Sequence, residues 1–258
     1  MARVLAISSQ VIYGPVGLNC IVPALQSGGH EVLAIPTILL SNHPGHGKPE
    51  GRATAPSEIS AMIFALEKLG AVKDLDAVIT GYFASVEQIE IVAALIGRLK
   101  CKIVLVDPVL GDDGKLYVAQ AVAEAIRDKL VPLATIVTPN AFELSWLTGH
   151  AVGNENEAVG AARSLNVNEV LATSIPHSAN ELSTLRITRA SVETITTPKE
   201  AKVANGTGDY LSGLYLAGLL VAQPQSAFAS AMHHLKQAIA RSKGTSILDV
   251  AHISKQKP

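Results

Sequence analysis

A short glycine-rich corner precedes a long apolar run and ends in a carboxylate: Gly206, Thr207, Gly208 and Asp209. The apolar run, residues 210–222, predicts a long helix that begins at this corner. The first N–H groups of a helix lack intrahelical partners and carry partial positive charge, so a phosphate group suits them as a ligand. Asp209 is then placed to act as a base toward a hydroxyl that attacks this phosphate. Taken alone, the corner favours a simpler interpretation, in which Asp209 only caps a core helix.

The elements that must position this corner alternate along the chain. Short apolar runs bounded by turn residues predict buried parallel strands at residues 4–7, 32–40, 77–80, 103–106, 135–137 and 170–172. Helical spacing and capping residues predict helices at 18–27, from Ser57, from Ser85, and at 118–130, 142–147, 155–165, 208–221 and 224–242. Residues 182–187 and 192–197 alternate apolar and polar side chains and predict a peripheral antiparallel pair. This order predicts an α/β fold, a mostly parallel sheet with helices on both faces.

Polar residues follow the ends of the predicted strands. They are Ser9, residues 41–46, Tyr82, and residues 107–112, 138–140 and 173–174. In open α/β sheets, ligands bind outside the carboxyl ends of the strands. We therefore expect these residues to converge with Asp209 on one active-site rim.

The chemistry that this rim suggests is phosphoryl transfer, which needs a phosphate cradle, carboxylates that orient a metal ion, and a base. Asp107, Asp112 and Glu143 follow two central strands, and Mg²⁺ is often held by one or two carboxylates together with substrate phosphates. Each residue also has a simpler explanation: the two aspartates stand in turn sequences, Glu143 begins a helix, and Asn140 caps it. The simpler explanations are favoured one at a time, whereas their convergence on one sheet edge favours the phosphoryl-transfer site.

Other patterns exclude competing classes of protein. Gly47-Lys48 is followed by Pro49, so the chain carries no P-loop, and no G-x-G-x-x-G follows a strand. His43 and His46 have H-x-x-H spacing but no third ligand, so no metal is expected there. The formal net charge is −1 and basic residues do not cluster, which argues against nucleic acid as a partner.

The composition is that of a globular protein, with 48% hydrophobic and 17% charged residues. The two cysteines, Cys20 and Cys101, are far apart and predict neither a disulfide framework nor a zinc site, which is typical of a reducing cytosol. The longest apolar run is too short to cross a membrane, so we expect a cytoplasmic protein without a membrane partner. The pair His233-His234 is expected on a partly exposed face of the last helix.

Seven motifs, in order along almost the whole chain, resemble those of the pyridoxal kinases in the ribokinase-like superfamily. Residues 7–14 resemble the family's opening I-Q-S-H-V-V-Y-G, and residues 40–43 resemble its F-S-N-H loop over the substrate. The others are T/S-G-Y at 80–82, D-P-V-L/M-G-D at 107–112, the segment beside the nucleotide at 116–118, T-P-N-x-x-E at 138–143, and the G-T-G-D anion hole at 206–209. The related hydroxymethylpyrimidine kinases usually carry cysteine at the position of Asp209, so this residue points to the pyridoxal branch.

The resemblance implies a three-layer α/β/α sandwich in which residues 1–258 form one kinase domain without a separate lid, usually as a homodimer. It implies ATP-dependent phosphorylation of the 5′-hydroxymethyl group of pyridoxal, and also of pyridoxine or pyridoxamine, in vitamin B6 salvage. Two alternatives stay open. One is a kinase for hydroxymethylpyrimidine or another small heterocycle, and the other is a non-catalytic protein that binds a B6 vitamer.

The resemblance also assigns roles to single residues. It implies that ATP phosphates lie on the anion hole and that Asp209, held ionised by the helix N-terminus, is the catalytic base. The residues implied for the substrate ring are Ser9, Val16, His43, Pro44, His46 and Tyr82. Those implied for ATP are Asp107, Tyr117, Asn140, Thr173 and Ser174. Asp112 and Glu143 would orient Mg²⁺, largely through water, and the position of a monovalent cation, Na⁺ or K⁺, would be formed by Asp107, Thr138 and Thr173.

The loop at 41–46 departs from the family pattern. Family members commonly read S-N-H-T and place the threonine against the substrate, whereas Pro44 stands here. Proline has no hydroxyl and no N–H, and losing a neutral hydrogen bond costs on the order of 1 kcal/mol. We therefore expect weaker or altered ring recognition with the chemistry intact. His46, where the family often has tyrosine, is expected to contribute to substrate choice as well.

Overall fold

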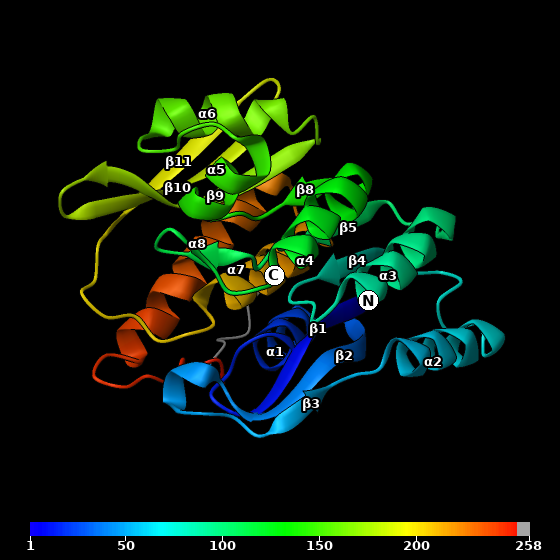
Figure 1. Ribbon diagram of the computed structural model, residues 1–258. Coiled ribbons are helices and arrows are strands. Elements are labelled where there is room, and N and C mark those ends of the chain that lie inside the picture. The colour runs from blue at the N-terminus through cyan, green and yellow to red at the C-terminus, as the bar shows by residue number, and fades with distance from the viewer. Residues whose placement is uncertain (252–258) are drawn as a thin grey trace.

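A nine-stranded sheet forms the centre of the protein, in the order β11-β10-β9-β8-β5-β4-β1-β2-β3 (Figure 1). The structure is a computed structural model that describes residues 1–251, so the end of the expected domain at 258 lies outside the described residues. The strands are β1 (Arg3–Tyr13), β2 (Glu31–Asn42), β3 (Gly51–Ala53), β4 (Ala77–Thr80), β5 (Ile103–Val106), β8 (Ile136–Val137), β9 (Glu169–Ser178), β10 (Glu181–Thr188) and β11 (Val192–Pro198). A separate hairpin pairs β6 (Gly111–Asp112) with β7 (Lys115–Leu116).

The sheet is mostly parallel, as the sequence predicts. Six neighbouring strands run parallel: β2, β1, β4, β5, β8 and β9. The antiparallel pair β10 and β11 extends the sheet beside β9, which confirms the peripheral pair. At the other edge β3 pairs antiparallel with β2. This strand is absent from the sequence-based prediction because its three residues are too few to show a period.

Helices cover both faces of the sheet (Figure 1). The helices are α1 (Leu18–Ser27), α2 (Pro56–Lys68), α3 (Val86–Arg98), α4 (Gln120–Ala125), α5 (Ala141–Thr148), α6 (Glu155–Ser164), α7 (Thr207–Leu219) and α8 (Pro224–Arg241). One core cluster packs α1, α7 and α8 against the sheet, and two others lie on the opposite face with α2 to α6. The expected three-layer α/β/α architecture is therefore confirmed.

Alternation along the strands decides which residues reach the site. In β5, Leu105 belongs to the core cluster beneath α7, whereas Val104 and Val106 belong to the cluster on the other face. Successive side chains of a strand point to opposite faces. Asp107, which follows Val106 directly, is therefore directed to the α7 face, beyond the carboxyl end of the strand.

Several sequence-based expectations are wrong in detail. The strand expected at 170–172 continues to Ser178 as β9, so Thr173 and Ser174 lie within it rather than after it. The first strand, expected to end at residue 7, continues to Tyr13, because its pairing with β2 shifts register between Ser8 and Gln10 and then resumes. Ser9 thus lies within β1 rather than after it. The helix expected at 118–130 is α-helical only over α4, and residues 126–133 follow as a π turn and a 3-10 turn. His233 is exposed as expected, but His234 is buried and its Nδ1 bonds the Ser230 carbonyl at 2.9 Å.

Candidate active site

The glycine corner begins α7 as predicted. Gly206 is the cap residue and has φ of 91°, a left-handed conformation that glycine adopts easily. A Cβ at this position would lie 2.2 Å from the Pro15 carbonyl oxygen and 2.9 Å from Cys20 Sγ, so the corner packs directly against the turn before α1. Because a glycine cap carries no side chain, it cannot bond the N–H groups of the first turn. These N–H groups are therefore suited to bind an anion.

Asp209 lies in the first turn of α7, partly buried. Its Oδ1 is 3.7 Å from the position that a Cβ on Gly81 would occupy, so the glycine leaves room beside the carboxylate. Burial raises the pKa of Asp209 to about 6, and a hydrogen bond to the Gly17 backbone opposes this rise. Loss of water is the largest influence on this carboxylate, and it acts against the ionised form that a helix N-terminus favours. A carboxylate with this pKa is still mostly ionised at neutral pH and is a stronger base than an exposed aspartate.

The end of β1 and the turn after it border one side of the corner. Ser8 is fully buried, and its Oγ accepts a hydrogen bond from the Tyr82 N–H at 3.2 Å. Ser9 is half-buried, and a Cβ on Gly17 would lie 2.3 Å from both its Oγ and its carbonyl oxygen. Gly17 has φ of 56° and follows the buried Val16. Ser9, Val16 and Tyr82 are thus brought to the same side of the corner, whereas the contact made by Ser8 is not anticipated from the sequence.

The loop after β2 folds over the same region as a 3-10 turn, η1 (Pro44–His46). His43 caps this turn, its Nδ1 accepting a hydrogen bond from the Gly45 N–H at 3.1 Å. Burial and the neighbouring His46 lower the pKa of His43. The His46 ring packs edge-on against Tyr13 with 5.2 Å between ring centroids. The loop therefore joins the site through its two histidines, while Pro44 is exposed.

The loop also touches the corner. A Cβ on Gly45 would lie 2.9 Å from the side-chain nitrogen of Asn205, the residue before the anion hole. His46 Nδ1 lies 3.4 Å from Ser246 Oγ, beyond the end of α8. Segments far apart in the sequence thus enclose the space next to Asp209.

A buried polar cluster joins three elements at the floor of the site. Ser212 Oγ donates a hydrogen bond to Asp107 Oδ2 at 2.9 Å and lies 3.0 Å from Thr138 Oγ1. All three residues are buried. Burial raises the pKa of Asp107 well above its usual range, and the charges of Asp209 and Glu143 add to this rise. Ser212 is absent from the sequence-based set, although its position three residues after Asp209, on the same face of a helix, could have revealed it.

Asn140 and Glu143 form a capping box at the start of α5. The Glu143 carboxylate accepts hydrogen bonds from the N–H groups of Leu110, Gly111 and Asn140 at 2.8, 3.4 and 2.9 Å. Asn140 Oδ1 accepts from the Glu143 N–H, and Nδ2 donates to the Gly111 carbonyl. Burial raises the pKa of Glu143 to about 7. Both residues therefore act at the start of the helix, as their simpler explanations predict. The same contacts also attach the 107–112 loop to α5.

The remaining predicted residues lie on the neighbouring part of the rim. Thr173 forms a parallel bridge with Asn140, and its N–H donates to the Pro139 carbonyl at 2.9 Å. Ser174, with φ of 54°, is exposed, as are Asp112 and Tyr117.

A metal ion would need help from the substrate at this rim. Within residues 1–251 no three His, Cys, Asp or Glu side chains are grouped so that they could hold a metal ion by themselves. Glu143 uses both carboxylate oxygens for backbone N–H groups. Asp112 is exposed, and one of its oxygens accepts the Asp113 N–H. Such residues fit Mg²⁺ bound through water and phosphate oxygens better than a cage of direct ligands.

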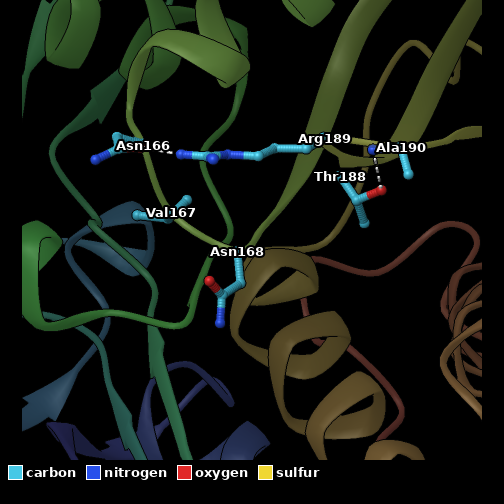
Figure 2. A pocket seen from close by; sticks show the side chains of 6 residues that line it. All are labelled: Asn166, Val167, Asn168, Thr188, Arg189 and Ala190. Atoms are coloured by element: carbon cyan, nitrogen blue, oxygen red, sulfur yellow. Dashed lines mark hydrogen bonds between the residues drawn. The ribbon is translucent and has the colours of Figure 1, made fainter.

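A separate hollow lies at the opposite edge of the sheet. It has a volume of about 310 Å³ and is lined by Asn166, Val167, Asn168, Thr188, Arg189 and Ala190 (Figure 2). Figure 2 shows the Arg189 side chain extended toward Asn166, whose Oδ1 it contacts at 2.5 Å. This hollow contains none of the predicted site residues. Within the described part of the chain, no helix has the length and apolar character needed to cross a membrane.

Comparison with known proteins gives a consistent result. The family model for phosphomethylpyrimidine kinase matches residues 53–250. The chain is 36% identical to a pyridoxine/pyridoxal/pyridoxamine kinase of Bordetella avium, covering 92% of this chain and 84% of that protein. It is 32% identical to a pyridoxal kinase of Granulibacter bethesdensis, covering 96% and 94%. The pyridoxal kinase of Leishmania donovani in complex with ADP and pyridoxine superposes with a TM-score of 0.90 at 29% identity, covering 96% and 92% of the two chains.

Proposed function

The chain belongs to the phosphomethylpyrimidine kinase family and, within it, to the pyridoxal kinases, and we propose that it transfers the terminal phosphate of ATP to the 5′-hydroxymethyl group of pyridoxal in vitamin B6 salvage. Pyridoxine and pyridoxamine are further substrates by the same relationship. The observation that supports this function is the start of α7. Asp209 directly follows the glycine corner, and no side chain caps the N–H groups of the first turn there. A base and a phosphate site are thus adjacent, as phosphoryl transfer requires.

The residues divide the reaction among them. The N–H groups of residues 206–208 would bind the phosphates of ATP, and Asp209 would accept the proton of the attacking hydroxyl. The oxygen of that hydroxyl forms the new bond to phosphorus, and ADP leaves. A pKa of about 6 suits Asp209 to this step, because the carboxylate is both ionised and reasonably basic at neutral pH.

The substrate and the nucleotide would occupy opposite sides of Asp209. The pyridoxal ring would lie among Ser9, Val16, Tyr82 and the 43–46 loop, with His43 and His46 as its polar neighbours. The nucleotide would lie along Tyr117, Asn140, Thr173 and Ser174. The contact of the 43–46 loop with Asn205 supports this placement, because it closes the substrate side at the corner where the phosphate would sit.

Cations are part of the proposal. The charges of Asp209 and Glu143 add to the rise that burial causes in the pKa of Asp107, and ATP would add further negative charge. Mg²⁺ would neutralise charge on the transferred phosphate, and Asp112 and Glu143 would orient it through water. Asp107, Thr138 and Thr173 would supply oxygen atoms to a monovalent cation such as K⁺.

The test is product formation from pyridoxal with ATP and Mg²⁺, followed by the absorbance of pyridoxal phosphate. Turnover should collapse in Asp209→Asn, while this variant remains folded and at least as stable as the wild type at pH 7.5, because it removes a buried charge. Hydroxymethylpyrimidine is run in parallel, because the matching family model is named for a pyrimidine kinase. Turnover of the pyrimidine alone, or undiminished turnover by the variant, would overturn the assignment.

We further propose that the protein acts in the cytoplasm as a homodimer of single-domain subunits. Ile12, Tyr13 and Leu39 support the dimer, because they are exposed apolar side chains on the paired ends of β1 and β2. Light scattering should give twice the chain mass of 27.0 kDa. A monomer mass at micromolar concentration would contradict the dimer and leave the activity untouched.

A further inference from the structure

Ser212 occupies a position that the proposed reaction does not yet explain. It lies in α7 one turn after Asp209, and only 2% of its surface is exposed. Its hydroxyl contacts both Asp107 at the end of β5 and Thr138 at the end of β8. One side chain thus connects the catalytic helix to two strand ends of the sheet.

Counting protons gives these contacts a direction. A serine hydroxyl has a single proton, and the Ser212 hydroxyl donates it to Asp107 Oδ2. When Ser212 donates to Asp107, its contact with Thr138 must therefore use the proton of Thr138. The Thr138 oxygen is then left with both lone pairs free, which makes it an acceptor that suits a cation.

The backbone holds Asp107 in the same way. Val109 has φ of 44°, a left-handed conformation that is unusual for a β-branched residue. A hydrogen bond from its backbone stabilises the charged form of Asp107. Strain of this kind persists only where surrounding contacts impose it, and it is common at functional sites. Ser212 and Val109 together keep the carboxylate in one orientation.

The charge around the cluster is uncompensated. Within residues 1–251 the groups that act most strongly on Asp107 are the carboxylates of Asp209 and Glu143 and the donors from Ser212 and Val109, with no lysine or arginine among them. A buried carboxylate without a positive partner is unfavourable. Carboxylate and hydroxyl oxygens are ligands that hard cations prefer.

We propose that Ser212 is a positioning residue that turns the oxygen atoms of Asp107 and Thr138 toward a monovalent cation beside the phosphoryl-transfer site. This inference rests on the cation position of the proposed function and adds the residue that sets its geometry. Removing the hydroxyl leaves Asp107 without one donor and frees Thr138 to direct its own proton at Asp107. The Thr138 oxygen then loses its fixed orientation, so the affinity for the cation falls.

The experiment compares Ser212→Ala and Ser212→Thr with the wild type. The first readout is the melting temperature during titration with KCl, with tetramethylammonium chloride keeping the ionic strength constant. The second is the K⁺ concentration for half-maximal kinase activity, measured with the KM for pyridoxal. Ser183→Ala is the matched control. Ser183 lies in β10, is also buried, and donates a hydrogen bond to the Glu155 carboxylate oxygen Oε1 at 2.6 Å.

Loss of one hydrogen bond to a charged group predicts a roughly tenfold higher half-saturating K⁺ concentration for Ser212→Ala. Ser212→Thr should restore the wild-type value, and Ser183→Ala should match the wild type. The KM for pyridoxal at saturating K⁺ should stay unchanged.

Equal K⁺ responses of Ser212→Ala and the wild type would overturn the proposal and assign Ser212 a purely structural role. A melting temperature of the wild type that does not change with K⁺ concentration would overturn it as well. Pyridoxal turnover would then still support the kinase function. Absence of turnover would contradict the kinase function, and the melting titration would still test Ser212. Should Ser212→Ala not fold, Ser212→Cys, which keeps the volume but donates weakly, gives the same comparison.

Discussion

Burial acts on Asp209 in the opposite direction from the helix terminus at which it lies. Its pKa is raised to about 6, since the loss of water outweighs the hydrogen bond to Gly17. Burial raises the pKa values of Asp107 and Glu143 as well. The site therefore keeps carboxylates that are more basic than exposed ones, which suits proton transfer near neutral pH.

This shift predicts an acid limb in the pH profile. Only the ionised Asp209 can accept a proton, so kcat/KM for pyridoxal should fall about tenfold per pH unit below about pH 6 and level off above it. Initial rates between pH 5 and 9 measure this. A profile that stays flat down to pH 5 would contradict the role of Asp209.

The same pKa shift allows loss of activity by protonation of Asp209 to be distinguished from loss of activity by acid unfolding. Because the folded state binds the Asp209 proton more tightly than the unfolded state, the contribution of this group to the free energy of unfolding increases as the pH falls from about 6 toward the unfolded pKa. The fall in activity should therefore appear while circular dichroism still reports a folded protein.

Pro44 has a local structural reason for its presence. It is the first residue of η1, a position where proline fits because its fixed φ matches the turn and no N–H is needed. Restoring a hydroxyl with Pro44→Thr should lower the KM for pyridoxal several-fold and leave kcat unchanged. Pro224→Thr is the matched control, because Pro224 opens α8 in the same way away from the site. An unchanged KM in Pro44→Thr would remove this residue from substrate recognition.

At the scale of single elements, α7 presents side chains to the sheet, whereas α5 attaches a loop. Helix α7 presents Asp209, Ser212 and Tyr215 to the sheet at intervals of three residues, and the hydroxyls of Ser212 and Tyr215 bond carboxylates there. Helix α5 is short, and its capping box attaches the 107–112 loop through backbone N–H groups. Each helix begins at the carboxyl edge of the sheet, so its first turn is both a structural end and part of the site.

This double role predicts a contrast between two helix caps. Asn140 caps α5 and Asn154 caps α6 with the same side-chain bond to a backbone N–H. Alanine at either position should lower the free energy of unfolding by about 1 kcal/mol, measured by urea unfolding. Only Asn140→Ala should also lower kcat/KM, by tenfold or more, because it releases Gly111 beside Asp112. Equal activities of the two variants would mean that Asn140 is only a cap.

At the scale of the whole molecule, a buried charged network attaches strands β9, β10 and β11 to helix α7. Arg186 of β10 bonds Tyr215 Oη of α7 at 3.0 Å and forms ion pairs with Glu169 of β9 and Glu193 of β11. Tyr215 Oη also donates to Glu169. Three strands and one helix thus share a single network on the face of the sheet that α7 covers.

Removing one partner should destabilise the fold without affecting the chemistry. Arg186→Met leaves Glu169 buried and uncompensated, so the free energy of unfolding should fall by about 3–5 kcal/mol, while kcat at 25 °C stays within about twofold. The matched control is Arg52→Met, which removes an exposed ion pair with Glu58 and should cost less than about 1 kcal/mol. The double change Arg186→Met with Glu169→Gln should recover part of the loss. Similar stabilities of the two single variants would contradict this role for the network.

Much of this molecule could be predicted from local patterns. Continuous apolar runs identified the six parallel strands, since strands covered on both faces have no polar side. The order of elements then predicted the layers, and the edge rule placed Asp107, Thr138 and Asp209 together. The strand β3, the extension of β1 to Tyr13 and the π turn after α4 were not predicted, because pairing with distant neighbours determines them.

By itself the sequence therefore determined the architecture, the family and the residue types on the active-site rim, because periodicity, capping and motif order are local properties of the chain. The tertiary structure alone decided how those residues act. Burial, which depends on every surrounding segment, set the pKa of Asp209, and contacts between α7, β5 and β8 brought Ser212 to Asp107 and Thr138. The water that a side chain loses and the partners that it gains come from residues distant in the sequence, and no local pattern records them.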